Sequence, residues 1–264
     1  MKPIIKWAGG KTQLLSKILP LIPDDIGTYY EPFFGGGAVF FALEPERAVI
    51  NDFNPQLTNL YERTRNNLDK LKDDMLKLSK QHNEDNYYLV RKQFNECLMN
   101  NELSVQSAAM LIYLNKAGFN GLYRLNSKGL YNVPSAKRKK VNLFDEENIN
   151  SVSKLLKNAD ILTGDFERAC LNAKEGDFVF FDSPYYNTFD TYQAGGFSED
   201  DHRRLAWLFR DLTDKGVKCM LTNSNEDFIK ELYKDYNIEV IDVKRMINSD
   251  ATKRSGQEII VTNY

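Results

Sequence analysis

The chain has 264 residues, 42% of them hydrophobic, which is enough for a sizeable core. Its net charge is −2, so global charge does not predict a polyanionic partner, and any basic surface must be local. Three scattered cysteines and two histidines argue against a disulfide framework, a zinc site and a metal hydrolase. No apolar run has the length of a signal peptide or a membrane span, so we expect a soluble, cytoplasmic protein.

Strand-like and helix-like patterns alternate at both ends of the chain. "TYYEPFFGGGAVFFAL" (28–43) predicts a strand, a glycine turn and a helix, and "RAVIND" (47–52) predicts a second strand. Further strand-like runs lie at 159–166, 176–184, 217–224, 237–243 and 257–264. Strands that alternate with helices form a sheet with crossovers, so the predicted fold class is α/β. The last two runs have no helix between them and should form a C-terminal β-hairpin.

The middle of the chain, residues 55–157, has a different pattern. Helical periodicity runs through 56–80 and 104–118, and no strand of the sheet is evident. Glycines, aromatics and basic residues then break the pattern over 118–142. We therefore predict a sheet domain made of 1–54 and 158–264, interrupted by an inserted, mostly helical subdomain that carries one exposed basic loop or hairpin.

Two features near the first strands are typical of nucleotide sites. The glycines of "EPFFGGGAV" (31–39) let a ligand approach the backbone at a helix N-terminus, although a plain tight turn explains them equally well. Asp52 closes the next strand, where an acid accepts hydrogen bonds from ribose hydroxyls. The alternative is that Asp52 caps the turn before the following helix. Its place after a glycine turn favours ribose binding.

Two further segments suggest ligand contacts. "KWAGGK" (6–11) precedes an amphipathic pattern and either packs its tryptophan or closes over a ligand, with Lys11 available to a carboxylate. "TGDF" (163–166) ends a strand with Asp165 and Phe166. An acid and an aromatic ring there can hold an adenine, by its amino group and by stacking, or the acid can cap the next helix.

The stretch "FFDSPYY" (180–186) carries the reactive chemistry. Asp182 emerges from a buried apolar strand and can accept a hydrogen bond from an exocyclic amino group. The carbonyl of Ser183 can accept the second hydrogen, Pro184 stiffens the loop and Tyr185 can stack on the base. This arrangement polarises a poor amine nucleophile and aims its lone pair at an electrophilic methyl group.

KWAGGK, EPFFGGG, AVINDFNP, TGDF and DSPY, in this order, resemble the Dam-type, α-class DNA adenine N6-methyltransferases. The resemblance runs from Lys6 to Tyr264, and "FNGLYRLNSKGLYNVP" (119–134) resembles the family's target-recognition region. It implies a Rossmann-like class I methyltransferase sheet, S-adenosyl-L-methionine as cofactor, double-stranded DNA as partner and a prokaryotic or phage-encoded enzyme.

The resemblance also assigns site residues. The catalytic motif corresponds to Asp182, Pro184 and Tyr185. The cofactor-contacting positions correspond to Trp7, Ala8, Gly9, Gly10, Lys11, Glu31, Pro32, Phe33, Gly35, Gly36, Gly37, Asp52, Asp165, Phe166 and Asp182. The family's usual motif is Asp-Pro-Pro-Tyr, and here Ser183 stands second. Since serine retains the carbonyl, we expect activity to survive, with a weakened enzyme as the alternative.

DNA recognition is expected from the middle segment. Its loop mixes stacking, wedge, amide and basic groups, and "KRKK" (137–140) is a local basic patch suited to phosphate. The expected DNA-binding residues are Asn120, Leu122, Tyr123, Arg124, Pro134, Lys137, Arg138 and Lys139. Lys137 stands where the family commonly has an arginine that reads guanine, so the expected target is GATC or a related short site.

The predicted reaction is transfer of a methyl group to N6 of an adenine flipped out of duplex DNA. The catalytic motif has no cysteine, so transfer should be direct, and no metal is required. The rivals are methylation of RNA or of a protein amide, and a DNA-binding relative that has lost catalysis. The sequence does not distinguish a restriction–modification role from a phage or regulatory one, and it gives no oligomeric state.

Overall fold

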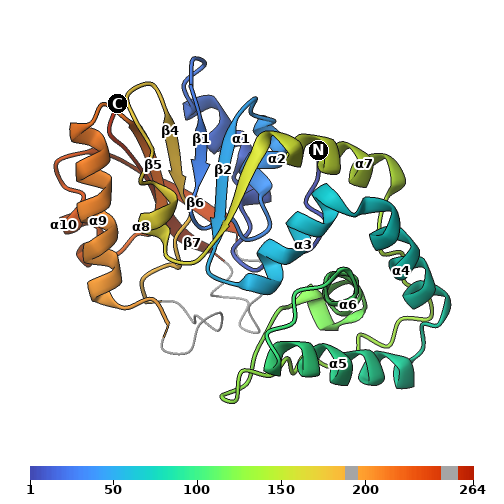
Figure 1. Cartoon of the computed structure of the whole chain (residues 1–264). Helices are drawn as coiled ribbons and strands as arrows, with labels where there is room; N and C mark the ends of the chain where they lie inside the picture. Colours follow the sequence, from blue (N-terminus) through green and yellow to red (C-terminus); the bar gives the residue numbers. More distant parts are fainter. Residues whose placement is uncertain (188–195, 245–254) are drawn as a thin grey trace.

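A mixed sheet organises the computed structural model, which describes residues 1–187, 196–244 and 255–264. The strand order is β3-β2-β1-β4-β5-β7-β6 (Figure 1). Strands β1 to β5 pair in parallel, and β7 pairs antiparallel with both β5 and β6. The bounds are β1 Tyr29–Glu31, β2 Ala48–Asp52, β3 Ala159–Thr163, β4 Phe178–Phe181, β5 Lys218–Ser224, β6 Asn237–Lys244 and β7 Ser255–Thr262. The predicted Rossmann-like α/β sheet and its C-terminal hairpin are confirmed.

Both faces of the sheet are covered, which explains the unbroken apolar run of β4. Phe178 and Phe180 pack into one core cluster with α2 and α3, and Val179 and Phe181 pack into a second cluster with α8, α9 and α10. A strand of a parallel sheet is buried on both faces, so its sequence shows no polar alternation. The helices are α2 Ala38–Leu43, α3 Pro55–Asn66, α8 Phe166–Ala169, α9 Glu199–Asp214 and α10 Asp227–Leu232.

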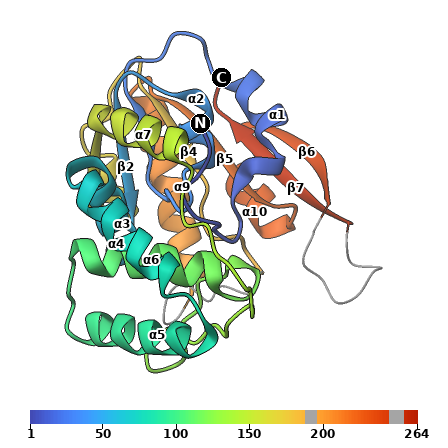
Figure 2. The ribbon, with the colours of Figure 1, turned by 90° about the vertical axis from the view of Figure 1, so that its right-hand side faces the viewer.

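The middle segment is helical, as predicted, and its described residues add no strand to the sheet. Its further elements are α4 Leu68–Lys80, α5 Glu84–Met99, α6 Val105–Ala117, η3 Phe119–Gly121, α7 Glu146–Leu155 and η4 Leu156–Asn158. Helix α6 lies between α3 and α5 in both views (Figures 1 and 2) and contacts α3, α4 and α5. It is apolar nearly all round because it is the centre of this helical layer.

The inserted helices share a core with the sheet. Helix α3 packs against β2 and β3 and also contacts α7, and the same apolar cluster continues into α4, α5 and α6. The predicted boundaries at 55 and 157 remain a prediction. The contacts identify α3 as the element that packs the insertion against the sheet, and α7, which packs on α3, leads the chain back to β3 through η4.

The N-terminal helix is shorter than its sequence pattern predicts. The amphipathic run after Gly10 forms a 3₁₀ turn η1 Lys11–Gln13, one turn of α-helix α1 Leu15–Ile18, and a second 3₁₀ turn η2 Leu19–Leu21. Pro20 explains the early end, because it has no N–H to continue the i→i−4 ladder.

Candidate active site

The strand order reverses between β1 and β4: the chain first adds β2 and β3 on one side of β1, and then β4 and β5 on the other. The glycine turn and the 182–186 motif both lie at this switch point. β1 pairs with β2 on one side and with β4 on the other, so the crossovers diverge at this point. Ligands of open α/β sheets bind in the crevice outside the carboxyl ends of such strands. Glu31 ends β1 and the glycine turn follows it, while Asp182 directly follows β4.

Asp182 is held by a buried cation. The Lys11 Nζ lies 2.5 Å from the Asp182 Oδ1, and the Thr222 Oγ1 donates to the same oxygen at 2.9 Å. Lys11 itself is 5% exposed and also donates to the carbonyl of Gly9 at 2.7 Å. Burial raises the pKa of Asp182, and Lys11 opposes that rise. The carboxylate that Lys11 was expected to meet is, in this structure, that of Asp182.

The residues after Asp182 are tied to neighbouring strands. The Tyr185 hydroxyl donates to the Glu258 Oε2 on β7 at 2.7 Å, and the Lys11 Nζ lies 4.7 Å from the centre of the Tyr185 ring. Ser183 is 2% exposed, and its Oγ accepts a hydrogen bond from the Asn223 Nδ2 at 3.2 Å. Aspartate, serine and tyrosine of the motif are therefore each anchored by a side-chain hydrogen bond.

The glycine turn and Asp52 form one unit. The Asp52 Oδ2 accepts from the Gly35 N–H at 2.8 Å, and its Oδ1 accepts from the Asn54 N–H at 2.9 Å. Gly35 has φ 48, and a Cβ there would lie 2.8 Å from the Trp7 ring. Burial raises the pKa of Asp52 to about 6, against the effect of its backbone donors. The capping alternative is thus realised, and the ribose contact stays a prediction.

The ends of β1 and β3 are joined through Asn51. Its amide donates to the carbonyls of Pro32 and Gly164, each at 2.9 Å. Glu31 is buried and accepts from the Tyr29 hydroxyl at 2.8 Å. Burial raises the pKa of Glu31 well above its usual range. Carboxyl groups therefore gather at the ends of β1, β2 and β4, with Glu31 buried and Asp52 and Asp182 partly buried, and such a cluster favours a positively charged ligand.

Phe166 lies beside Phe33, at the start of α8, and Asp165 caps that helix. The rings of Phe33 and Phe166 are 5.2 Å apart. Asp165 caps α8 through the Glu167 N–H at 2.9 Å and pairs with Arg204 of α9 at 2.9 Å. The Arg204 guanidinium also lies 4.9 Å from the Phe166 ring centre. The predicted capping alternative is therefore present, and the contact with adenine stays a prediction.

The 6–11 segment reaches both the glycine turn and the middle loop. Ala8, Gly9 and Gly10 form an exposed turn, closed by the Gly10 N–H and the Trp7 carbonyl at 3.2 Å. The Trp7 ring stacks on Tyr123 with centres 5.1 Å apart. Tyr123 is only 4% exposed, so its side chain packs inside the protein instead of lying on the predicted DNA-facing surface.

The other predicted DNA-binding residues lie at or near the surface of the 119–140 segment, which we call the recognition hairpin. Asn120 is exposed and has φ 55. The Arg124 Nε donates to the Asn132 Oδ1 at 2.7 Å, and Lys137 lies 3.6 Å from Glu84 of α5. Leu122 is half-buried, whereas Pro134, Arg138 and Lys139 are exposed.

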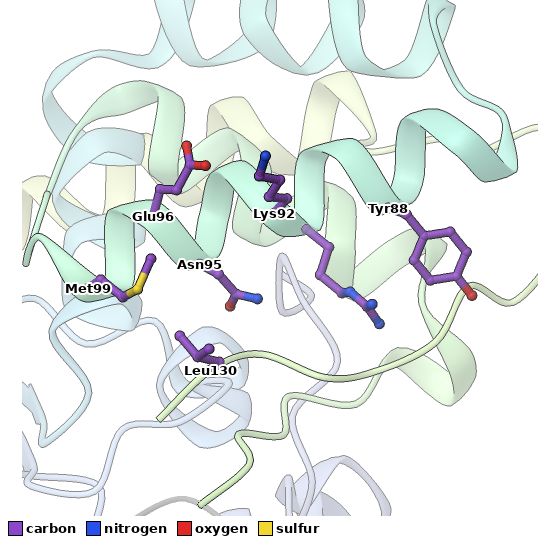
Figure 3. Close-up of a pocket in the computed structure, with 7 residues that line it drawn as sticks. Tyr88, Lys92, Asn95, Glu96, Met99 and Leu130 are labelled. Carbon is purple, nitrogen blue, oxygen red and sulfur yellow. The ribbon is translucent and has the colours of Figure 1, made fainter. Parts of the chain in front are cut away.

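Helix α5 anchors the recognition hairpin. The Asn95 side chain exchanges two hydrogen bonds with the Tyr131 backbone, at 2.7 and 3.1 Å, and Arg91 donates to the Val133 carbonyl at 3.2 Å. A pocket of about 280 Å³ lies along this seam, and Figure 3 shows Asn95 beside Leu130 there. The pocket is lined by α5 and the hairpin, and none of its lining residues belongs to the crevice around Asp182.

Sequence reasoning missed four residues of the site: Thr222, Asn223, Glu258 and Arg204. The first two carried a usable signal, because "TNS" follows the buried run of β5 just as "DSP" follows that of β4. Glu258 and Arg204 carried none, since an acid in an edge hairpin and an arginine on a helix are ordinary surface features. Within the three described ranges, no group of His, Cys, Asp and Glu is arranged to hold a metal ion, and no helix could cross a membrane.

Comparison with known proteins identifies the class. Residues 7–247 match the family model of D12 class N6 adenine-specific DNA methyltransferases. The chain therefore belongs to this family, whose members transfer a methyl group from S-adenosyl-L-methionine, and the Dam-type resemblance is confirmed.

Individual members of this class are similar to the chain over nearly its whole length. The chain is 42% identical to "Type II methyltransferase M1.LlaDCHI" of Lactococcus lactis subsp. cremoris, covering 100% of this chain and 96% of that one. It is 41% identical to "Type II methyltransferase M.MjaIII" of Methanocaldococcus jannaschii, covering 100% and 99%. It is 31% identical to "DNA adenine methylase" of Haemophilus influenzae, covering 96% and 90%.

Proposed function

We propose that the crevice at the ends of β1 and β4 is the active site, with Asp182, Pro184 and Tyr185 as its catalytic residues. The observation that carries this proposal is the buried Asp182 carboxylate, held between Lys11 and Thr222 at the switch point of the sheet. A carboxylate fixed in this way is ready to accept a hydrogen bond without first reorganising.

The residues around the crevice fit S-adenosyl-L-methionine. The turn of Gly35, Gly36 and Gly37 presents backbone without side chains, and the carboxyl groups of Glu31 and Asp52 favour a cationic ligand. The proposed contacts along the crevice run from the 7–11 turn through Glu31, Pro32, Phe33 and the glycines to Asp52, Asp165 and Phe166. When bound there, this cofactor supplies the methyl group as an electrophile.

The chain's own residues then act on the amine. Asp182 accepts a hydrogen bond from the N6 amino group, the Ser183 carbonyl accepts the other hydrogen, and Tyr185 stacks on the flipped adenine. Lys11 keeps Asp182 an acceptor, because a neighbouring cation opposes protonation of a buried carboxyl group. The target must leave the base stack, since N6 is otherwise paired.

We place DNA recognition on the segment 55–157, where α3 packs against the sheet and α7 leads the chain back to it. Asn120, Leu122, Arg124, Pro134 and Lys137 are proposed to read the bases, and Arg138, Lys139 and Lys140 to contact phosphate. Buried Tyr123 supports this surface from within through its stack on Trp7. The proposed target is GATC or a related short site in duplex DNA.

The proposed cellular location rests on the proposed substrates. Since duplex DNA and S-adenosyl-L-methionine are found inside cells, we propose that the protein acts in a prokaryotic cytoplasm. Relatives named type II methyltransferases favour a role in restriction–modification.

The test is to express the full chain in cells without adenine methylation and to sequence their DNA with detection of N6-methyladenine. Methylation at one short motif is expected, and cells with Asp182→Asn should show far less. Modified RNA or protein with unmodified DNA would establish the rival amino-methyltransferases, and DNA binding without any transfer would establish the catalytically weakened relative.

A further inference from the structure

Three consecutive polar residues at the end of β5 are buried, although polar side chains of this kind usually lie at the surface. Thr222 and Asn223 are 0% exposed and Ser224 is 4% exposed. β4 and β5 are parallel neighbours in a register that pairs Phe181 with Leu221. The residues that follow this last pair therefore lie side by side, and the polar end of β5 contacts the catalytic loop 183–186.

Asn223 contacts this loop at both of its ends. Its Nδ2 donates to the Ser183 Oγ at 3.2 Å, and its Oδ1 accepts from the Tyr186 N–H at 3.0 Å. Ser224 adds a third bond, because its Oγ donates to the Tyr186 carbonyl at 2.9 Å. One amide thus spans the four residues that contain Pro184 and Tyr185.

We propose that Asn223 is a positioning residue for methyl transfer, and that it holds the catalytic loop through its hydrogen bond to the Ser183 hydroxyl. This inference rests on the proposed role of Asp182 and Tyr185. The serine is then no mark of decay: a hydrogen bond to a buried amide limits the loop where the family's usual motif has a proline ring.

The physical reason is the cost of leaving buried polar atoms unpaired. The Asn223 amide is fully buried, and if the loop moved, its Nδ2 would lose the Ser183 Oγ without gaining water. Its Oδ1 would lose the Tyr186 N–H and keep only the hydrogen bonds from Ser224. The loop is therefore restrained to the conformation in which the Ser183 carbonyl and the Tyr185 ring are offered together. Such restraint acts on the rate of transfer more than on the binding of either substrate.

The test compares Ser183→Ala, Ser183→Thr, Asn223→Ala and the double Ser183→Ala/Asn223→Ala variant of the full chain. Asn225→Ala is the matched control, because the Asn225 side chain donates to Gln257, outside the loop. For each we would measure the single-turnover rate on a duplex carrying the target site, the dissociation constants for S-adenosyl-L-methionine and for that duplex, and the midpoint of thermal unfolding.

Ser183→Ala is expected to slow transfer about three- to tenfold, the effect of one lost hydrogen bond, and Asn223→Ala about ten- to a hundredfold. The double variant should be no slower than Asn223→Ala alone, because the serine acts through the asparagine. Ser183→Thr, which retains the hydroxyl, should stay within about threefold of wild type. Both dissociation constants should change less than about twofold.

A wild-type rate in Ser183→Ala would overturn the inference, even if Asn223→Ala fails to fold. So would a loss of rate that is matched by loss of cofactor affinity, or one shared by Asn225→Ala. If wild type transfers no methyl group to any adenine-containing duplex, the proposed function fails, and this inference fails with it. If wild type is active and the Ser183 and Asn223 variants transfer methyl groups at the wild-type rate, the inference fails while the proposed function stands.

Discussion

The segment 182–186, proposed as the catalytic loop, and the recognition hairpin are held in opposite ways. In the loop, the side chains themselves are bonded: Asp182 to Lys11, Ser183 to Asn223 and Tyr185 to Glu258. In the hairpin, α5 bonds chiefly to backbone, through Asn95 and Arg91. The exposed Arg124 and Lys137 have their polar partners, Asn132 and Glu84, at the surface.

This difference agrees with the roles proposed for the two segments. A reacting amine has to meet an acceptor within a fraction of an ångström, so the acceptor must be fixed before the substrate arrives. Base edges and phosphates are met by long side chains that adjust on contact. Substitutions in the loop should therefore change the rate, whereas those in the hairpin should change affinity and sequence preference.

The largest effect is expected from Asp182→Asn. It retains the size of the side chain but loses the charge-assisted acceptor, so the rate of methyl transfer should fall at least about a hundredfold. Single-turnover kinetics on a target duplex, with circular dichroism as a check of folding, would measure it. A rate within about tenfold of wild type would remove Asp182 as the main acceptor of the amine.

Cofactor affinity should depend on Asp52 by a smaller amount. Asp52→Ala removes the tie to the glycine turn and the proposed ribose contact, at a cost of about 1–3 kcal/mol in binding free energy. Calorimetric titration with S-adenosyl-L-methionine measures the loss, and Asp160→Ala, an exposed acid on β3, is the control. An unchanged dissociation constant would leave Asp52 as a cap only.

The hairpin predictions separate base reading from phosphate contact. Arg124→Ala or Lys137→Ala should relax sequence preference at one position, with a discrimination loss of about 1–3 kcal/mol. Lys139→Ala and Lys140→Ala should weaken every sequence alike and lower the salt slope of binding by about one unit. Methylation of a library of substituted sites at two salt concentrations distinguishes them.

An equal effect of Arg124→Ala and Lys137→Ala on all sites would mean that neither reads sequence. Recognition would then belong elsewhere, such as the loop after Tyr186, most of which lies outside the described residues. That result would also contradict the expectation that substitutions in the hairpin change sequence preference.

The smallest effect is a pH dependence of stability. The pKa of Asp52 is raised to about 6 in the folded protein, so its contribution is most favourable at low pH and is lost as pH rises through that value. Between pH 5 and 7, wild type should lose roughly 1 kcal/mol of unfolding free energy relative to Asp52→Asn. Urea unfolding of both proteins at the two pH values measures this, and parallel curves would contradict the raised pKa.

The fold was largely predictable because its signals are local. Alternating strand and helix patterns predicted the α/β sheet, and the unbroken apolar run of β4 predicted a buried strand. The short α1 and the break at Asn67 between α3 and α4 were not predicted, since a proline and a backbone kink act against otherwise continuous periodicity. Lys11 was singled out as a carboxylate partner, but its partner, Asp182, lies far along the chain.

The sequence by itself determined the family, the order of the motifs and the residues that we propose for the chemistry, because each motif is a short local run that can be recognised without the fold. Only the tertiary structure decided which of those residues meet. Side-by-side strands brought Asn223 to Ser183 and Thr222 to Asp182, and stacking on Trp7 placed Tyr123 inside the protein. Such contacts join residues far apart in sequence, and their energy arises from burial and hydrogen bonding, which no local pattern records.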